Sequence, residues 1–100
     1  RNDGALVRHH SGVAGYSQFS VVARESVVKI DADLPMETAV LFGCAVMTGV
    51  GAVVNTARVA AGTSVAVFGA GGVGLSAIMG AKAVGAWPII AIDRVASKLG

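Results

Sequence analysis

Three glycines with the spacing G-x-G-x-x-G, Gly69, Gly71 and Gly74, follow directly after an apolar run. Each glycine costs conformational entropy on folding, so the cluster indicates a backbone that side chains would obstruct. Between a strand and a helix, the first glycine permits a tight turn, the second lets a pyrophosphate approach and the third allows close helix packing. The N–H groups of Gly72 and Val73 would then lie at the helix N-terminus, where they can donate to phosphate oxygens.

An acidic residue after the next apolar run completes this pattern. Asp93 follows Gly74 by about 20 residues, and its carboxylate can accept hydrogen bonds from both hydroxyls of an adenosine ribose. A carboxylate there repels a 2′-phosphate and favours NAD over NADP, although Arg94 beside it can tolerate the phosphate. The other interpretation is a glycine turn in an unrelated α/β domain, with Asp93 as a cap. The complete context favours dinucleotide binding.

Hydrophobic patterning predicts the elements that position these residues. Residues 64–68 are expected to form a strand, residues 72–84 a helix that Gly85 caps, and residues 88–93 a second strand. Strand, helix and strand in this order define a βαβ unit with parallel strands and a right-handed crossover. A polar helix start is predicted at 95–98.

The first half of the chain has a different pattern. Residues 18–22 and 26–30 are rich in β-formers and predict two short antiparallel strands. Residues 36–43 predict a short helix, and residues 46–59 predict a second one. The sequence Gly43-Cys44 is expected to break the two helices apart.

Composition and charge limit the function classes. The chain has 100 residues, of which 54% are hydrophobic and 14% charged, which is apolar for a free-standing globule and predicts a fragment of a longer protein. Its net charge is +2 and its Lys and Arg residues are scattered along the sequence, so nucleic acid is not an expected partner. The one cysteine, Cys44, excludes an internal disulfide and fits a reducing, cytoplasmic setting. The polar N-terminus shows no signal peptide.

Two uncharged stretches are long enough to span a bilayer. They lie between Glu37 and Arg58 and between Arg58 and Lys82. The first contains small residues, among them Gly49 and Gly51, that allow close packing against another element. The second has the glycine cluster in its middle, where a spanning helix would need partners to satisfy its freed backbone groups. The expectation is therefore that no membrane is involved.

Four stretches of the chain together resemble a known enzyme family. They are "GYSQFSVVARESVVKID" (15–31), "LFGCAVMTGVGAV" (41–53), "VFGAGGVGLSAIMGAKAVGA" (67–86) and "IIAIDRVASKL" (89–99). The chain resembles the zinc-dependent alcohol dehydrogenases of the medium-chain dehydrogenase/reductase superfamily over about residues 9–100. This resemblance implies an α/β fold. Residues 1–45 would end a GroES-like, β-rich catalytic domain, and residues 46–100 would form an interdomain helix and the first βαβ unit of a Rossmann NAD-binding domain.

The resemblance also implies roles for single residues. Cys44 matches a ligand of the catalytic zinc, and Thr48 and Val73 match positions that touch the nicotinamide. Lys98 matches a residue that helps to hold the adenosine ribose beside Asp93. Without the resemblance, Cys44 would be interpreted as a small buried hydrophobe, Thr48 as a side chain bonded to a helix carbonyl, and Lys98 as a solvated charge.

Some residues match the substrate pocket or depart from the family pattern. His10 and Ser11 fall where substrate-pocket residues are often found. Ala45 stands where glycine is usual, and Met47 where serine is common. The pocket is therefore expected to differ from that of simple alcohol enzymes.

By this resemblance, the intact protein transfers a hydride from an alcohol, with aryl and primary alcohols as candidates, to NAD, with zinc as Lewis acid. One alternative is a zinc-free, quinone-reductase-like NAD(P)H oxidoreductase with a structural Cys44. Another is a non-catalytic nucleotide-binding module. The family's other zinc ligands, its structural zinc lobe and the remaining sheet are absent from this chain. The chain alone is therefore expected to be inactive, and the intact protein to be a homo-oligomer.

Overall fold

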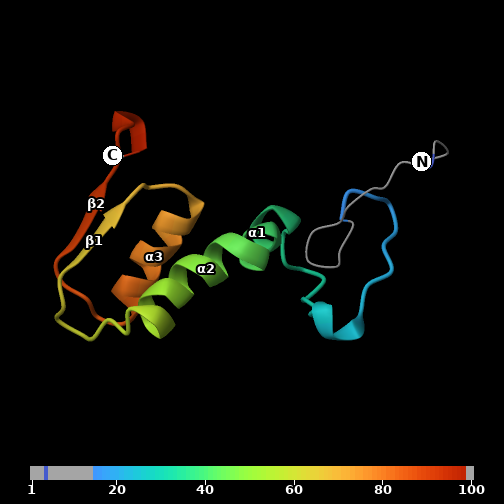
Figure 1. Ribbon diagram of the computed structural model, residues 1–100, viewed down its shortest axis with the longest axis horizontal. Coiled ribbons are helices and arrows are strands. Elements are labelled where there is room, and N and C mark those ends of the chain that lie inside the picture. Colours follow the sequence, from blue (N-terminus) through green and yellow to red (C-terminus); the bar gives the residue numbers. More distant parts are fainter. Residues whose placement is uncertain (1–3, 5–14, 99–100) are drawn as a thin grey trace. The chain divides into compact units, whose positions relative to one another are not determined.

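The computed structural model describes residue 4 and residues 15–98 (Figure 1). By its internal contacts the chain divides into two units, Arg1–Ala32 and Asp33–Gly100, and each is considered by itself. The domain boundary expected after residue 45 concerns the domains of a parent protein and remains a prediction.

The first unit contains a single 3₁₀ turn, Arg24–Ser26, and no strand among its described residues. The antiparallel strands predicted at 18–22 and 26–30 are therefore wrong. Strands need neighbours for their N–H and C=O groups, and an isolated two-stranded hairpin is marginal in water. Side chains such as Phe19 and Val28 are largely exposed, so no packed face holds a hairpin together here.

The second unit begins with one continuous helix, Met36–Thr56. It consists of α1 (Met36–Leu41), a π-helical turn (Phe42–Val46), α2 (Met47–Gly51) and a second π-helical turn (Ala52–Thr56). The predicted break at Gly43-Cys44 is wrong, because a π turn accommodates an extra residue without ending the helix. Pro35 directly precedes the helix, where its missing N–H removes no helical hydrogen bond.

By length and composition alone, helix Met36–Thr56 could cross a membrane, and it is the one such helix within the described part of the chain. This is weak evidence, since core helices of water-soluble proteins pass the same test. Gly49 and Val53 are buried in its packing against α3 (Gly72–Ala83), whereas Met36 and Val40 are exposed. The finding therefore does not place the chain in a membrane.

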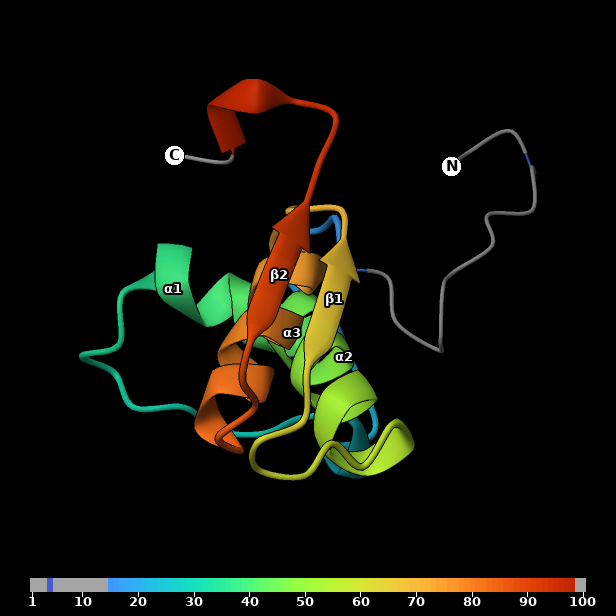
Figure 2. The same cartoon turned by 90° about the vertical axis from the view of Figure 1, so that its left-hand side faces the viewer.

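The predicted βαβ unit is present (Figure 2). It consists of β1 (Val65–Phe68), α3 (Gly72–Ala83) and β2 (Ile89–Ile92). The strands pair in parallel, with Val65 opposite Ile89 and Phe68 opposite Ile92. Val65 and Ile89 pack toward the core, whereas Phe68, Ile90 and Ile92 are exposed. One face of this small sheet is therefore an uncovered apolar surface.

A glycine ends α3 as the sequence predicted. Gly85 adopts a φ of +77°, a left-handed conformation that is strained for other residues. Its N–H donates to the Lys82 carbonyl (3.0 Å), and the Ala86 N–H donates to the Ala81 carbonyl (2.9 Å). This pair of bonds is the Schellman arrangement, which satisfies carbonyls at the helix end and turns the chain toward β2.

Small residues let α2 and α3 pack closely, and the two helices lie side by side in Figure 1. A Cβ built on Gly49 would lie 2.6 Å from the Ser76 Cβ and 2.7 Å from the Ala77 nitrogen. A Cβ on Gly80 would lie 3.2 Å from the Val50 Cα. At Gly49, the two backbones are closer than any side chain would allow.

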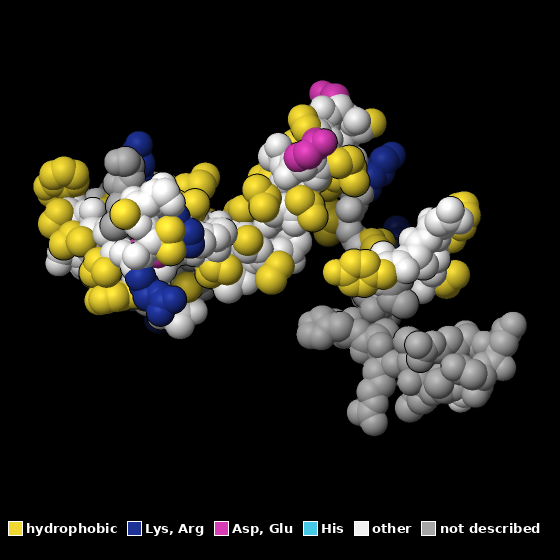
Figure 3. Space-filling model, turned by 90° about the horizontal axis from the view of Figure 1, so that it is seen from above, with side chains coloured by type: hydrophobic (Ala, Val, Ile, Leu, Met, Phe, Trp, Pro, Cys, Tyr) yellow, Lys and Arg dark blue, Asp and Glu magenta, His cyan; other side chains and the backbone are white. Residues whose placement is uncertain are grey.

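The apolar core beside this contact is small. Its buried members are Val53, Ala81 and Ala86, and Val65 and Ile89 pack against them. No large side chain is fully buried among the described residues, and hydrophobic side chains are scattered over the visible face (Figure 3). Parallel sheets are normally covered on both faces, so the second unit presents apolar surface that a larger fold would cover.

The two glycines of α2 provide a matched pair for testing this packing. Gly49→Ala should lower the thermal midpoint of the intact protein, because the new methyl group would force α3 away; overpacking costs about 1–3 kcal/mol. Gly51→Ala should leave the midpoint unchanged or raise it. Its Cβ would meet only the Asn55 Nδ2 at 3.8 Å, and alanine favours a helix by up to about 1 kcal/mol. Equal midpoints for the two variants, measured by calorimetry, would contradict the packing described.

Candidate functional site

The glycine turn has the steric reasons that the sequence predicted for its first and third glycines. Gly69 adopts a φ of +96° directly after β1. A Cβ on Gly74 would collide with the Gly69 carbonyl oxygen and lie 2.9 Å from its carbonyl carbon. The third glycine therefore lets α3 start directly against the end of β1. A Cβ on Gly71 would meet no atom of the described residues within 4 Å, so they leave the space outside the turn open.

Helix α3 starts at this turn with unpaired backbone donors. Gly71 is its N-cap and Gly72 and Val73 are its first residues, and no side chain of the described residues caps the helix. The first N–H groups of an α-helix have no partner within it, and the helix dipole favours negative charge there. Gly72 is exposed and Val73 is 44% exposed, so an anion can reach this end.

Asp93 lies directly after β2, at the same end of the sheet as the turn. Its Oδ2 accepts a hydrogen bond from the Ala70 N–H (2.7 Å), in the middle of the glycine turn. Its Oδ1 accepts one from the Val95 N–H (2.9 Å). Sequence reasoning placed Asp93 correctly at the end of the strand but missed the bond to Ala70. No local signal shows which backbone N–H a carboxylate more than twenty residues away will meet.

These contacts change the acidity of Asp93. Hydrogen bonds from the backbone N–H groups of Val95 and Ala70, and the positive charge of Lys98, hold the pKa of its carboxyl group below the ordinary value of 3.8. Each of them stabilises the charged form. Asp93 is therefore ionised throughout the neutral range and can act only as an acceptor.

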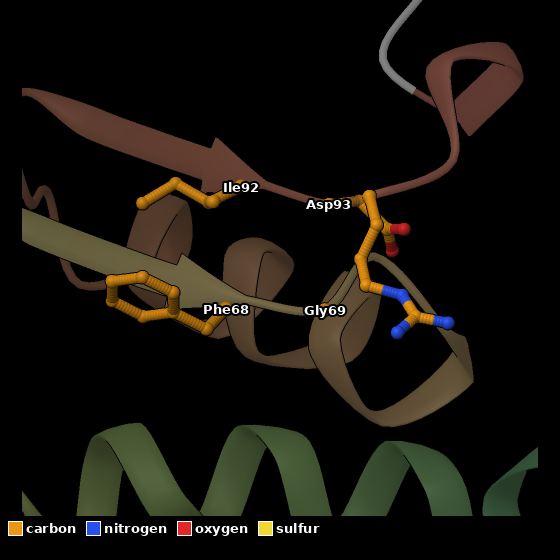
Figure 4. Close-up of a pocket in the computed structure, with 5 residues that line it drawn as sticks. Phe68, Gly69, Ile92 and Asp93 are labelled. Carbon is orange, nitrogen blue, oxygen red and sulfur yellow. The ribbon is translucent and has the colours of Figure 1, made fainter.

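The Lys98 side chain and a largely apolar pocket lie beside the carboxylate. Lys98, in a 3₁₀ turn where a helix start was predicted, places its Nζ 3.6 Å from Asp93 Oδ2. A pocket beside it is lined by Phe68, Gly69, Ile92, Asp93 and Arg94 (Figure 4). In this view Asp93 and Gly69 face each other across the ends of the two strands. The arrangement offers an acceptor, nearby positive charges and apolar side chains together.

Cys44 and Thr48 lie on the long helix and are exposed. Thr48 makes no side-chain hydrogen bond among the described residues, so the alternative of a bond to a helix carbonyl is not seen. Residues 15–98 contain no group of three metal-ligating side chains. Catalytic zinc takes three protein ligands, so the described residues do not fit a zinc ion by themselves. His10 and Ser11 lie outside the described residues.

No family model matches the chain, but solved structures do. An alcohol dehydrogenase zinc-binding domain protein from Burkholderia ambifaria is 47% identical, with a TM-score of 0.65. Benzyl alcohol dehydrogenase from Acinetobacter calcoaceticus is 46% identical, with a TM-score of 0.67. Each similarity covers 72% of this chain and 20% of the other protein. The predicted resemblance to zinc-dependent alcohol dehydrogenases, and with it an α/β fold, is confirmed for the part that these structures cover.

The lowered pKa of Asp93 predicts an acid-side loss of stability. The contribution of the ionised Asp93 to the free energy of unfolding is complete at pH values above 3.8, which is the pKa of the unfolded chain. It is lost as the pH falls through the lower pKa of the folded state. Asp93→Asn removes this titration. The thermal midpoint of the intact wild-type protein should therefore exceed that of the variant at about pH 5, and the difference should shrink toward about pH 3. A difference that stays constant or grows on acidification would contradict the contacts described.

Proposed function

We propose that the intact protein is an NAD-dependent alcohol dehydrogenase that transfers a hydride between an alcohol and the nicotinamide. The observation that carries this proposal is the glycine turn with Asp93 and Lys98 beside it, in a chain 46–47% identical to alcohol dehydrogenases. The similarity to these proteins supports the enzyme class, and the geometry of the site supports the cofactor. Aryl and primary alcohols and their aldehydes are the proposed substrates, since one of the similar proteins is a benzyl alcohol dehydrogenase.

The residues at the turn fit a dinucleotide. The N–H groups of the exposed residues Gly72 and Val73 would donate to the pyrophosphate, because Gly71 leaves the approach open. Asp93 would accept hydrogen bonds from the adenosine ribose, with Lys98 beside it. When bound, NAD supplies the hydride chemistry. Thr48 and Val73 would contact the nicotinamide.

The proposed domain organisation follows the same resemblance. Residues 1–45 would belong to a GroES-like catalytic domain, and residues 46–100 would begin a Rossmann domain. The uncovered sheet face around Phe68 and Ile90 supports this, because further elements of such a domain would cover it. The chain spans a fifth of the length of the similar structures. The intact protein is proposed to be a cytoplasmic homo-oligomer, and this chain alone to be inactive.

Zinc is proposed for the intact protein, with Cys44 as one of its ligands. The thiol is exposed on a helix that packs against α3, and a thiolate is a ligand that zinc prefers. The remaining ligands would have to come from outside the described residues. The zinc-free, reductase-like alternative is not favoured by the similar proteins, one of which is named for a zinc-binding domain.

Asp93→Ser tests the cofactor assignment. The variant should lower kcat/KM for NAD about tenfold or more, because hydrogen bonds to the ribose are lost. It should raise the use of NADP relative to NAD, since the carboxylate no longer repels a 2′-phosphate and Arg94 is free to pair with it. Steady-state kinetics with both cofactors measures the ratio. An unchanged ratio would show that Asp93 does not face the ribose.

Cys44→Ala tests the zinc proposal. The variant of the intact protein should lose a bound zinc, measured by elemental analysis, and its alcohol oxidation should fall to background. NAD affinity, measured by calorimetry, should survive because the turn and Asp93 are unchanged. Full zinc content with a normal rate would make Cys44 a structural residue and favour the zinc-free alternative.

A further inference from the structure

The glycine turn has little on its outer side to hold its shape. Within the part of the chain that the structure describes, a Cβ built on Gly69 or Gly71 would meet no atom within 4 Å, and no side chain caps α3. Glycine backbone has more accessible conformations than that of any other residue. An unrestrained turn of this composition would therefore occupy many conformations, only some of which direct its N–H groups toward one anion.

Two hydrogen bonds on the inner side restrain the turn. The Gly69 N–H donates to the Ile92 carbonyl (2.7 Å), which extends the pairing of the two strands. The Ala70 N–H donates to Asp93 Oδ2 (2.7 Å). Ala70 is only 6% exposed, so water cannot readily replace the carboxylate as acceptor. Losing Asp93 would leave a buried N–H without a partner, which carries its full desolvation cost.

The carboxylate is itself held in place. The Val95 N–H donates to Oδ1 (2.9 Å), Lys98 lies 3.6 Å from Oδ2, and the Asp93 side chain is 8% exposed. An ionised carboxylate has about four acceptor positions, and the two backbone N–H groups fill two of them. Acceptor capacity therefore remains for ribose hydroxyls while the bond to Ala70 stays in place.

We propose that Asp93 is a positioning residue for the phosphate-binding turn, which it holds in its binding conformation before any dinucleotide arrives. This role rests on the proposed function and is additional to contact with the ribose. It makes a distinct prediction, because it gives Asp93 an effect on the pyrophosphate, a group that it does not touch. If Asp93 only contacted the ribose, it would not favour the binding of the pyrophosphate.

The first test uses inorganic pyrophosphate, which has no ribose, as a competitor of NAD in the intact protein. Asp93→Ser should weaken pyrophosphate binding about 2- to 10-fold, the range that one hydrogen bond supplies. Asp93→Asn should weaken it less, since one acceptor oxygen remains. Both variants remove a negative charge, which by itself would strengthen anion binding, so a loss of affinity supports positioning. Unchanged or tighter pyrophosphate binding together with weaker NAD binding would overturn the proposal.

The second test uses hydrogen exchange and needs no ligand. In the intact protein without cofactor, the amides of Gly69 and Ala70, which the two inner hydrogen bonds protect, should exchange faster in both Asp93 variants than in the wild type. Amides of helix Met36–Thr56 serve as the folding control and should be unchanged. Equal exchange at the turn, or faster exchange in both segments of both variants, would overturn the proposal. Failure of the wild type to bind NAD would instead overturn the proposed function, because the exchange result is independent of it.

Discussion

The close contact between α2 and α3 is the constraint on which the arrangement of the second unit depends. Gly49 lies against Ser76 and Ala77 at a separation that a larger residue would prevent, and at Gly80 a Cβ would make a tight contact with Val50. Few large side chains are buried beside this contact, so the approach of the two backbones fixes the position of α3. Because α3 begins at the glycine turn, this contact also sets where the turn lies relative to the long helix.

The second constraint acts at the ends of the strands. Parallel pairing brings the residues after β1 and β2 to one edge of the sheet, which is where ligands bind in open α/β folds. Here a hydrogen bond also joins the two strand ends at that edge, since Asp93 accepts it from the backbone N–H of Ala70. In the proposed function the same side chain would both bind the ribose and support the turn, so an effect of Asp93 on cofactor binding need not come from the ribose alone.

The exposed apolar surface and the similarity to alcohol dehydrogenases have one common explanation. The chain covers a fifth of the similar structures, and its sheet face and long helix expose side chains such as Phe68, Ile90 and Met47. Burying apolar surface is the main driving force of folding, so surface of this kind requires cover. Additional elements of the proposed larger dehydrogenase would supply this cover, and in that proposal they would also supply the further zinc ligands.

The sequence by itself determined the βαβ unit, the cap at Gly85 and the position of Asp93, because glycine conformation and hydrophobic spacing are local signals. Local signals failed at 18–30, where β-forming residues have no neighbouring strand, and at Gly43-Cys44, where a π turn carries the helix through the expected break.

Only the tertiary structure decided which small residues and which hydrogen bonds are critical. The sequence grouped Gly49 with Gly51, but only Gly49 faces a neighbouring backbone. It predicted that Asp93 binds a ribose, but the hydrogen bond to Ala70 depends on how the two strand ends meet in space. Contacts between residues far apart in the chain follow from packing, and no spacing pattern contains them.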